Sequence, residues 1–158
     1  MRKLRIYIDT SVISHLFADD APDKMADTNA FWNDLASGQY QIFISPTTVE
    51  ELEACQEPKR SRMYQKLDEI PFQLLEETGE VNQLAHEYIT HGVLNEKSFD
   101  DCMHIAFAVV FDCDVIVSWN FKHLVNFKTI NRVKIVNAIN QYREISIITP
   151  TMLLEEGD

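Results

Sequence analysis

Apolar residues occur along the chain in two alternating patterns. Short apolar runs predict buried strands at 4–9, 41–45, 72–75, 114–118 and 145–149. Between them, apolar residues spaced three or four apart predict helices at 25–37, 48–56, 59–70, 79–90, 99–112 and 131–143. A further short helix is expected to begin near Val12 and to end before Ala21-Pro22-Asp23. Because strands alternate with helices, we expect an α/β fold, a three-layer α/β/α sandwich around a mostly parallel central sheet.

The length and composition predict a single domain that spans residues 1–158. A chain of 158 residues with 46% hydrophobic content can bury one core and is too short for two ordinary domains. Only four glycines are present, and no internal repeat or linker interrupts the pattern. The sequence contains no apolar run of about 18 residues, and Met1-Arg2-Lys3 leads directly into a strand. We therefore expect a soluble, cytoplasmic protein that does not bind a membrane.

The three cysteines do not indicate a disulfide framework or a zinc site. Cys55, Cys102 and Cys113 are odd in number and have neither CxxC nor Cys/His finger spacing. Buried free thiols are the simplest interpretation.

The charge distribution limits the possible nucleic-acid contacts. A net charge of −11 argues against a protein that coats nucleic acid, because phosphate contacts require Lys and Arg. The segment 115–143, however, contains five basic residues and no acid: Lys122, Lys128, Arg132, Lys134 and Arg143. A second basic stretch spans 59–66. Each stretch is either a solvated helix face or a phosphate-binding surface, and the remaining acidity suits a metal site or a basic partner.

Three acidic residues and one amide occur near the expected ends of strands. Asp9 closes the first strand, Glu51 follows the second, and Asp101 opens the apolar helix at 99–112. Asn120 follows the strand at 114–118. The carboxyl ends of parallel strands meet at one crevice, so these side chains can become neighbours. Clustered carboxylates and water are the ligands that Mg²⁺ or Mn²⁺ prefers.

Helix capping offers a local alternative for each acid. Thr48 and Glu51 have the spacing of a capping box, and Ser98 and Asp101 have similar spacing. Asp9 could terminate a strand or cap the following helix. Three acids at equivalent positions are harder to explain as independent caps, and capping does not exclude metal binding. We therefore predict that Asp9, Glu51 and Asp101 bind the metal.

Several neighbours of these acids are candidates for supporting roles. Thr10 and Ser11 suit helix capping, or a hydroxyl could approach the metal or a phosphate. His104 lies one turn after Asp101, and a buried, hydrogen-bonded histidine is favoured over a metal ligand because such an ion prefers oxygen. The supporting candidates are Thr10, Ser11, Glu50, Asp100, His104 and Ser118.

Four segments together resemble the PIN domain family, and specifically the VapC-like ribonuclease toxins of bacterial type II toxin–antitoxin systems. They are Tyr7-Ile8-Asp9-Thr10-Ser11, Thr48-Val49-Glu50-Glu51-Leu52, Asp101-Cys102-Met103-His104-Ile105-Ala106 and Ser118-Trp119-Asn120-Phe121-Lys122-His123-Leu124. The resemblance covers nearly the whole chain. It implies that Asp9, Glu51 and Asp101 are metal-binding catalytic acids, that a cognate antitoxin exists, and that the chain forms a homodimer.

Asn120 departs from the family pattern, because many relatives have a fourth acid at this position. Asparagine offers a carbonyl oxygen but no negative charge and cannot act as a base near neutral pH. A weaker second metal site is expected.

The leading hypothesis is a metal-dependent endoribonuclease in which Lys122, Lys128 or Arg132 positions the RNA backbone. The main alternative is a PIN-like scaffold that binds a protein or RNA without turnover. A phosphatase or phospho-receiver fits less well, because Asp9 lacks a second acid two residues later.

Overall fold

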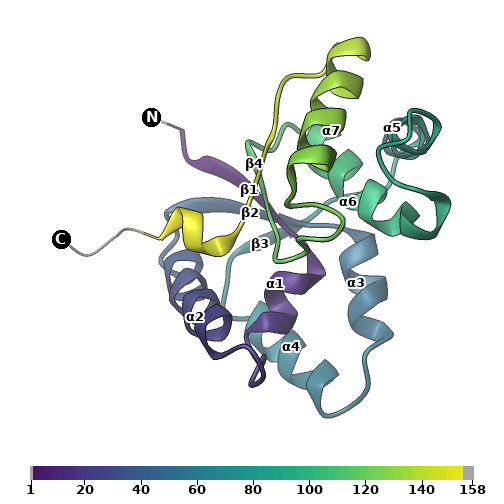
Figure 1. Cartoon of the computed structure of the whole chain (residues 1–158). Coiled ribbons are helices and arrows are strands. Elements are labelled where there is room, and N and C mark those ends of the chain that lie inside the picture. Colours follow the sequence, from purple (N-terminus) through teal and green to yellow (C-terminus); the bar gives the residue numbers. More distant parts are fainter. Residues whose placement is uncertain (1, 155–158) are drawn as a thin grey trace.

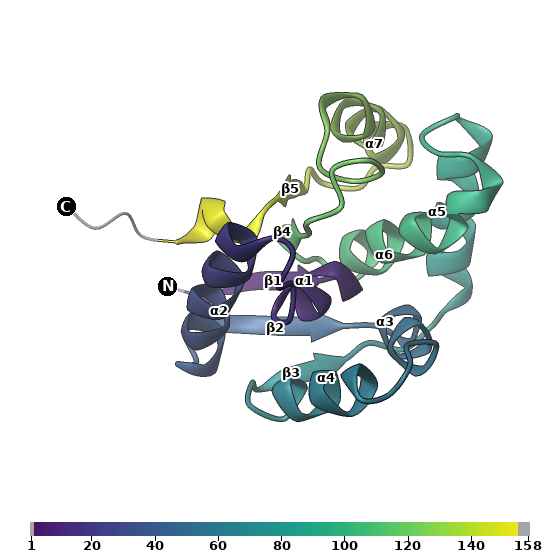
Figure 2. The same ribbon diagram turned by 60° about the horizontal axis from the view of Figure 1, so that its bottom comes forward.

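The computed structural model describes residues 2–154, and within them a five-stranded sheet is covered by helices on both faces (Figures 1 and 2). The strands are β1 (Leu4–Ile8), β2 (Tyr40–Ile44), β3 (Phe72–Leu74), β4 (Val115–Val117) and β5 (Ser146–Ile148). The α-helices are α1 (Thr10–His15), α2 (Pro22–Ala36), α3 (Pro46–Glu53), α4 (Lys59–Leu67), α5 (Gly79–Thr90), α6 (Phe99–Val110) and α7 (Phe127–Ile139). Two short 3₁₀ helices, η1 (Glu96–Ser98) and η2 (Pro150–Leu153), were not predicted.

All strand pairings are parallel, in the order β3-β2-β1-β4-β5. The chain starts in the centre of the sheet with β1 and builds first toward β3 and then toward β5. The carboxyl ends of the central strands β1, β2 and β4 therefore lie at one edge, with the helices that follow them close by. The predicted α/β class and three-layer arrangement are confirmed.

Side chains alternate between the two faces of the sheet and form two separate cores. Tyr7 and Phe43 pack under helices α5, α6 and α7, together with residues such as Phe107. Ile6 and Ile42 point to the opposite face and pack with the apolar sides of α1, α2, α3 and α4. A strand that is buried on both faces has no polar alternation, which explains the continuous apolar runs in the sequence.

Proline and asparagine signals account for the helices that begin earlier than expected. Helix α2 begins at Pro22 and α3 at Pro46, and proline at the first position suits a helix because its missing N–H would be unsatisfied there anyway. Helix α7 begins at Phe127 rather than near residue 131, because the Asn126 side chain accepts a hydrogen bond from the Thr129 amide. The prediction that Thr48 is the N-cap of its helix is wrong. Ser45 is the N-cap, and Thr48 completes the capping box from inside α3.

Two of the three thiols lie in the core. Cys102 and Cys113 are buried, and burial raises the pKa of each to about 12. Cys55 is half-buried, so the expectation of burial is wrong for that residue. All three are free, and no helix within residues 2–154 combines the length and apolarity needed to cross a membrane.

Candidate functional site

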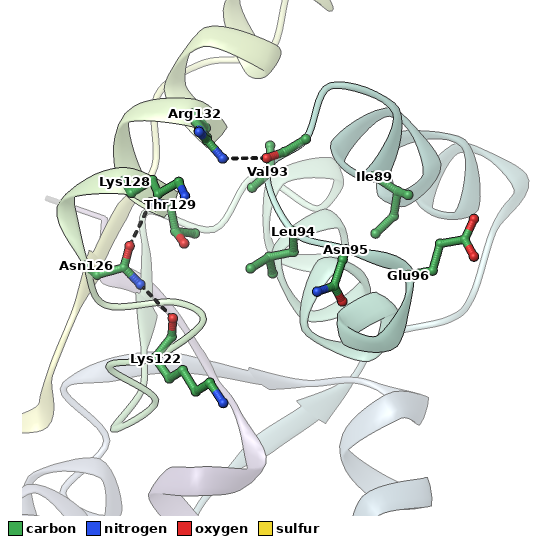
Figure 3. Close-up of a pocket in the computed structure, with 11 residues that line it drawn as sticks. Ile89, Val93, Leu94, Asn95, Glu96, Lys122, Asn126, Lys128, Thr129 and Arg132 are labelled. Atoms are coloured by element: carbon green, nitrogen blue, oxygen red, sulfur yellow. Dashed lines mark hydrogen bonds between the residues drawn. The ribbon is translucent and has the colours of Figure 1, made fainter.

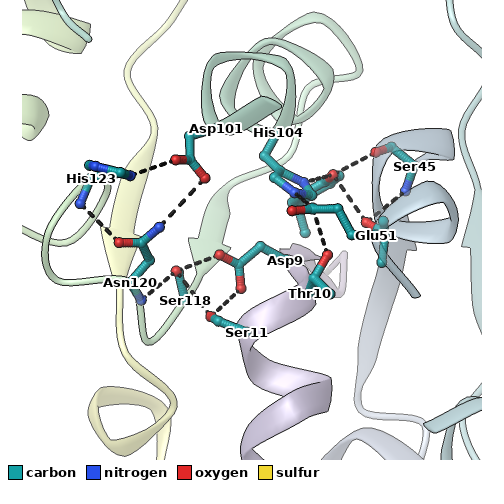
Figure 4. Close-up of polar contacts among 12 residues, drawn as sticks. Asp9, Thr10, Ser11, Ser45, Glu51, Asp101, His104, Ser118, Asn120 and His123 are labelled. Atoms are coloured by element: carbon teal, nitrogen blue, oxygen red, sulfur yellow. Dashed lines mark hydrogen bonds and ion pairs between the residues drawn. The ribbon is translucent and has the colours of Figure 1, made fainter. Parts of the chain in front are cut away.

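Asp9 lies at the carboxyl end of the central strand β1 and is 3% exposed. It occupies the N-cap position of α1, but its side chain forms no capping hydrogen bond. Its two oxygens instead accept hydrogen bonds from the hydroxyls of Ser11, at 2.6 Å, and Ser118, at 2.5 Å (Figure 4). Ser118 directly follows β4, so two adjacent strand ends hold this carboxylate in place.

Glu51 reaches the same region from helix α3 (Figure 4). Its Oε1 accepts hydrogen bonds from the Thr10 hydroxyl, at 2.8 Å, and from His104 Nε2, at 2.5 Å. His104 is buried on α6, and its Nδ1 lies 2.6 Å from the hydroxyl of Tyr7. The buried Tyr7 hydroxyl also lies 2.7 Å from Ser45 Oγ. A chain of buried polar contacts from β1 and α6 thus holds one oxygen of Glu51.

Asp101 lies in the first turn of α6 and faces the loop after β4. Its Oδ2 is 2.8 Å from His123 Nδ1, and its Oδ1 is 3.5 Å from Asn120 Nδ2. The Asn120 carbonyl oxygen accepts a hydrogen bond from the His123 amide at 2.9 Å. Asn120 therefore fixes the turn that brings His123 to Asp101.

For two of the three carboxylates, hydrogen bonds and nearby positive charge do not offset the cost of burying the ionised form. Burial raises the pKa of Asp9 and of Asp101. The charge of Glu51 raises the pKa of Asp101 further, and the charge of Asp101 raises that of Asp9. Burial also opposes ionisation of Glu51, but the hydrogen bonds from His104 and Thr10 and the charge of His104 lower its pKa overall. Asp101 is thus close enough to interact unfavourably with both of the other acids.

The charge of His104 lowers the pKa of all three acids. Burial alone would lower the pKa of His104 itself, but Tyr7, the hydrogen bond and charge of Glu51, and the charge of Asp9 raise it well above the usual value. The imidazolium form is therefore favoured, and it offsets part of the negative charge at this edge of the sheet.

The donor chemistry fits a divalent cation, although the observed side-chain arrangement does not form a ligand cage. Among residues 2–154, no group of three or more His, Cys, Asp or Glu side chains is placed to hold a metal ion. Each acid is engaged by separate partners from the protein. Carboxylates are nevertheless the oxygen donors that Mg²⁺ or Mn²⁺ prefers, and a cation would relieve the repulsion between Asp101 and its two acidic neighbours. Joint ligation would require the carboxylates to turn away from their present partners.

The supporting candidates fall into two groups. Thr10, Ser11, His104 and Ser118 all contact an acid directly, as described above. Glu50 and Asp100 are exposed, and their side chains form no hydrogen bond or ion pair within the described part of the chain. The sequence analysis did not select His123 or Tyr7 as site residues. His123 contacts Asp101, and Tyr7 contacts His104. The only sequence signal for His123 was its position three residues after Asn120.

The three basic residues proposed for RNA contact line one groove of about 530 Å³ (Figure 3). Lys128 and Arg132 come from α7, and Lys122 comes from the loop before it. None of the three acids lines this groove. It adjoins them through the chain, because Lys122 lies two residues after Asn120 and next to His123.

The PIN domain family matches residues 5–122, which include all three acids and Asn120. The chain belongs to the PIN domain family. Its structure is similar to that of VapC20 from Mycobacterium tuberculosis, described as a toxin that cleaves the sarcin–ricin loop. The two chains share 17% identity with a TM-score of 0.58, and the match covers 75% of this chain and 92% of VapC20.

A second similar structure comes from VapBC2 of Rickettsia felis, described as bound to a DNA fragment from its promoter. The identity is 13% and the TM-score is 0.55, and the match covers 91% of this chain and 97% of that chain. Both similarities concern the fold. No curated protein gave a significant sequence match.

Proposed function

We propose that this PIN domain is a divalent-metal-dependent endoribonuclease and the toxin component of a type II toxin–antitoxin pair. The observation that carries the proposal is the meeting of Asp9, Glu51 and Asp101 at one edge of the sheet. They lie close enough for Asp101 to raise the pKa of Asp9 and for Glu51 to raise that of Asp101. PIN domains typically use divalent metal ions, and this edge supplies the carboxylates for one.

Asp9, Glu51 and Asp101 would hold the Mg²⁺ or Mn²⁺ ion. When bound, such an ion lowers the pKa of a water molecule and stabilises the charge that develops on the scissile phosphate. The protein's own contribution is orientation, since hydroxyls hold Asp9 and the buried His104 holds Glu51.

Asn120 adds no charge to this arrangement. Its carbonyl oxygen accepts a hydrogen bond from the His123 amide, and this contact shapes the turn after β4. Three carboxylates without a fourth favour one well-bound ion and a weaker second site.

The partners proposed for this chain are RNA, a cognate antitoxin and a second copy of the chain. One structural neighbour comes from a VapBC complex, which supports an antitoxin. The net charge of −11 suits a basic partner of this kind.

The test is cleavage of defined RNAs by purified protein, with a hairpin loop and an unstructured strand as separate substrates. We expect cleavage with Mn²⁺ or Mg²⁺, loss of cleavage in chelator, and loss in Asp9→Asn and Asp101→Asn. Asp100→Asn is the matched control, because it removes the adjacent but exposed acid. Cleavage that persists in chelator or in Asp9→Asn would contradict the metal-dependent mechanism.

A PIN scaffold that binds without turnover is the second candidate. The absence of a preformed ligand cage in the described residues and the neutral Asn120 favour it. Metal titration separates the two functions. A nuclease should show Mn²⁺-dependent thermal stabilisation that is lost in Asp101→Asn, whereas an inert scaffold should show none.

A further inference from the structure

A second groove, of about 320 Å³, lies between helix α7 and β5, the strand at one edge of the sheet (Figure 2). One wall is formed by residues 144–148, and the other by side chains of α7 that include Ile130, Lys134 and Asn137. Aliphatic side chains dominate both walls, and two of them, Ile130 and Ile145, are only half-buried. We call this the β5 groove. It leaves apolar surface open beside the edge of the sheet.

Strand β5 has backbone groups available on its outer side. The Ser146 amide donates to the carbonyl oxygen of Asp114 at 3.2 Å, and the Ile148 carbonyl oxygen accepts from the Ser118 amide at 2.9 Å. Because successive residues of a strand direct their backbone groups to opposite sides, the N–H and C=O of Ile147 face away from β4. Within the described chain, no strand pairs with that side. The edge can therefore accept a further strand.

The wall of the β5 groove also contains a donor that the chain alone does not satisfy. Asn137 is 1% exposed, and its Oδ1 accepts a hydrogen bond from the Tyr88 hydroxyl at 2.5 Å. Its Nδ2 is the one buried side-chain nitrogen or oxygen atom without a hydrogen-bond partner among residues 2–154. Buried polar groups are rarely left unpaired, so this wall is incomplete in the isolated chain.

The charges at the β5 groove are balanced, unlike those of the protein as a whole. Lys134 Nζ lies 3.3 Å from Glu144 Oε1, and no other charged residue lines the groove. The whole chain has a net charge of −11, so most faces of one copy repel another copy. A neutral, apolar face with one residue of each sign is compatible with the same face on a second copy.

The opposite edge of the sheet lacks this balance. Strand β3 is also an edge strand of three residues, but Glu76 and Glu77 follow it closely. Both are exposed, and neither forms an ion pair with a described residue. Two copies that met at β3 would bring these carboxylates together, which disfavours association there.

We propose that two copies of this chain associate at the β5 edge, through antiparallel pairing of their β5 strands, with each copy covering the β5 groove of the other. Such a contact has two-fold symmetry and joins the two sheets into one. The inference rests on the proposed function, which includes a second copy among the partners, and it assigns the surface. Because the paired strands run in opposite directions, the two acid sites would lie at opposite edges of the joined sheet.

The first test changes charge at the interface without touching the core. Lys134→Glu places two acids beside the β5 groove of each copy and should raise the dimer dissociation constant by at least about 10-fold. Lys66→Glu is the matched control, because Lys66 pairs with Glu69 elsewhere and the charge change is the same. Lys134→Glu/Glu144→Lys restores one residue of each sign and should restore the dimer. Sedimentation velocity over a range of micromolar concentrations measures all four proteins.

The second test maps the strand pairing by cross-linking. Ile147 lies at the centre of β5, and the Cα atoms of a hydrogen-bonded antiparallel pair are about 5.5 Å apart, a distance that a disulfide spans. Ile147→Cys should therefore form a covalent dimer under mild oxidation, visible on a non-reducing gel. Gln73→Cys, at the centre of β3, is the control and should remain monomeric on the gel, as should the wild type.

Three results would overturn the β5 interface: a wild type that sediments as a monomer at every concentration, equal weakening of the dimer by Lys134→Glu and Lys66→Glu, or no recovery in the double variant. Lys134 and Glu144 are exposed, so their variants keep the fold and remain informative even if Ile147→Cys does not fold.

The interface and the nuclease function can fail separately. If the wild type cleaves RNA with Mn²⁺ but its association does not respond to Lys134→Glu, the interface fails and the nuclease stands. If the charge variants and the cross-link behave as expected but no RNA is cleaved, the nuclease fails and the interface stands.

Discussion

Acidic residues at the amino and carboxyl edges of the central sheet are in opposite electrostatic situations. At the amino edge, Asp114 accepts hydrogen bonds from the guanidinium groups of Arg2 and Arg143 and from the Arg5 amide. Although burial opposes ionisation, these contacts lower the pKa of Asp114. At the carboxyl edge, burial and neighbouring acids raise the pKa of Asp9 and Asp101.

The difference shows which edge is organised for stability and which for binding. At the amino edge, arginines already neutralise Asp114, so a bound cation is not needed there. The carboxyl edge keeps carboxylates close together with serine, threonine and histidine partners that offset only part of their charge. Buried carboxylates with raised pKa values are typical of functional sites, where binding or catalysis requires residues that are unfavourable for stability.

The largest expected effect is on RNA cleavage by substitutions at the two edges. Asp101→Asn should reduce kcat by at least about 10²-fold, since losing roughly 3 kcal/mol of charge stabilisation has that effect. Asp114→Asn at the opposite edge should cleave like the wild type. Initial rates with Mn²⁺ test the pair, and equal losses in both variants would remove the distinction between the edges.

His104→Gln is expected to reduce cleavage by about 10- to 100-fold, the usual effect of losing a group that orients a metal ligand. The reason is that His104 Nε2 holds Glu51 Oε1. Tyr7→Phe removes only the hydroxyl next to His104 Nδ1 and should have a smaller effect in the same direction. Mn²⁺ affinity from thermal shifts provides a second readout, and unchanged Mn²⁺ affinity and kcat in His104→Gln would argue for a purely structural histidine.

Stability should respond in the reverse order. Asp114→Asn should lower the free energy of unfolding by about 1–2 kcal/mol, because it weakens charged hydrogen bonds to partly exposed arginines. Asp101→Asn should lower it less or raise it, because it removes a charge that burial disfavours. Urea unfolding in chelator measures both, and a larger loss for Asp101→Asn would contradict the comparison.

The pH dependence of stability should also differ in sign between the edges. The lowered pKa of Asp114 stabilises the fold above its ordinary value of 3.8, and this contribution is lost as the pH falls through the folded pKa. Asp101 has a raised pKa, so the folded carboxyl binds its proton more tightly than the unfolded one. Its contribution therefore falls as the pH rises from 3.8 through the folded pKa. Unfolding curves of wild type and the two Asn variants across this range provide the test.

The smallest expected effect belongs to the exposed acids that flank the site. Glu50→Gln and Asp100→Asn should change neither cleavage nor stability by more than about 0.5 kcal/mol, as is usual for exposed positions. Glu50 immediately precedes Glu51, and Asp100 immediately precedes Asp101, so each variant is a control for its neighbour. A marked loss of cleavage in either would mean that the acid turns inward when RNA or metal binds.

The sequence by itself determined the order of strands and helices, the α/β class and the approach of three acids to one sheet edge. These features follow from hydrophobic periodicity and from the geometry of parallel sheets, which are local or general properties. The helix at 79–90 matches α5 at both ends, and Thr78 caps its amino end. The start of α7 was missed because the capping role of Asn126 was not recognised.

Only the tertiary structure decided which partner each acid has. Asp9 and Ser118 are 109 positions apart in the chain, and Glu51 and His104 are 53 apart. It likewise decided that Lys122, Lys128 and Arg132 line one groove. Periodicity fixes the face on which a side chain lies, whereas hydrogen bonds and charge interactions depend on distances of a few ångströms that only the packed helices and strands establish.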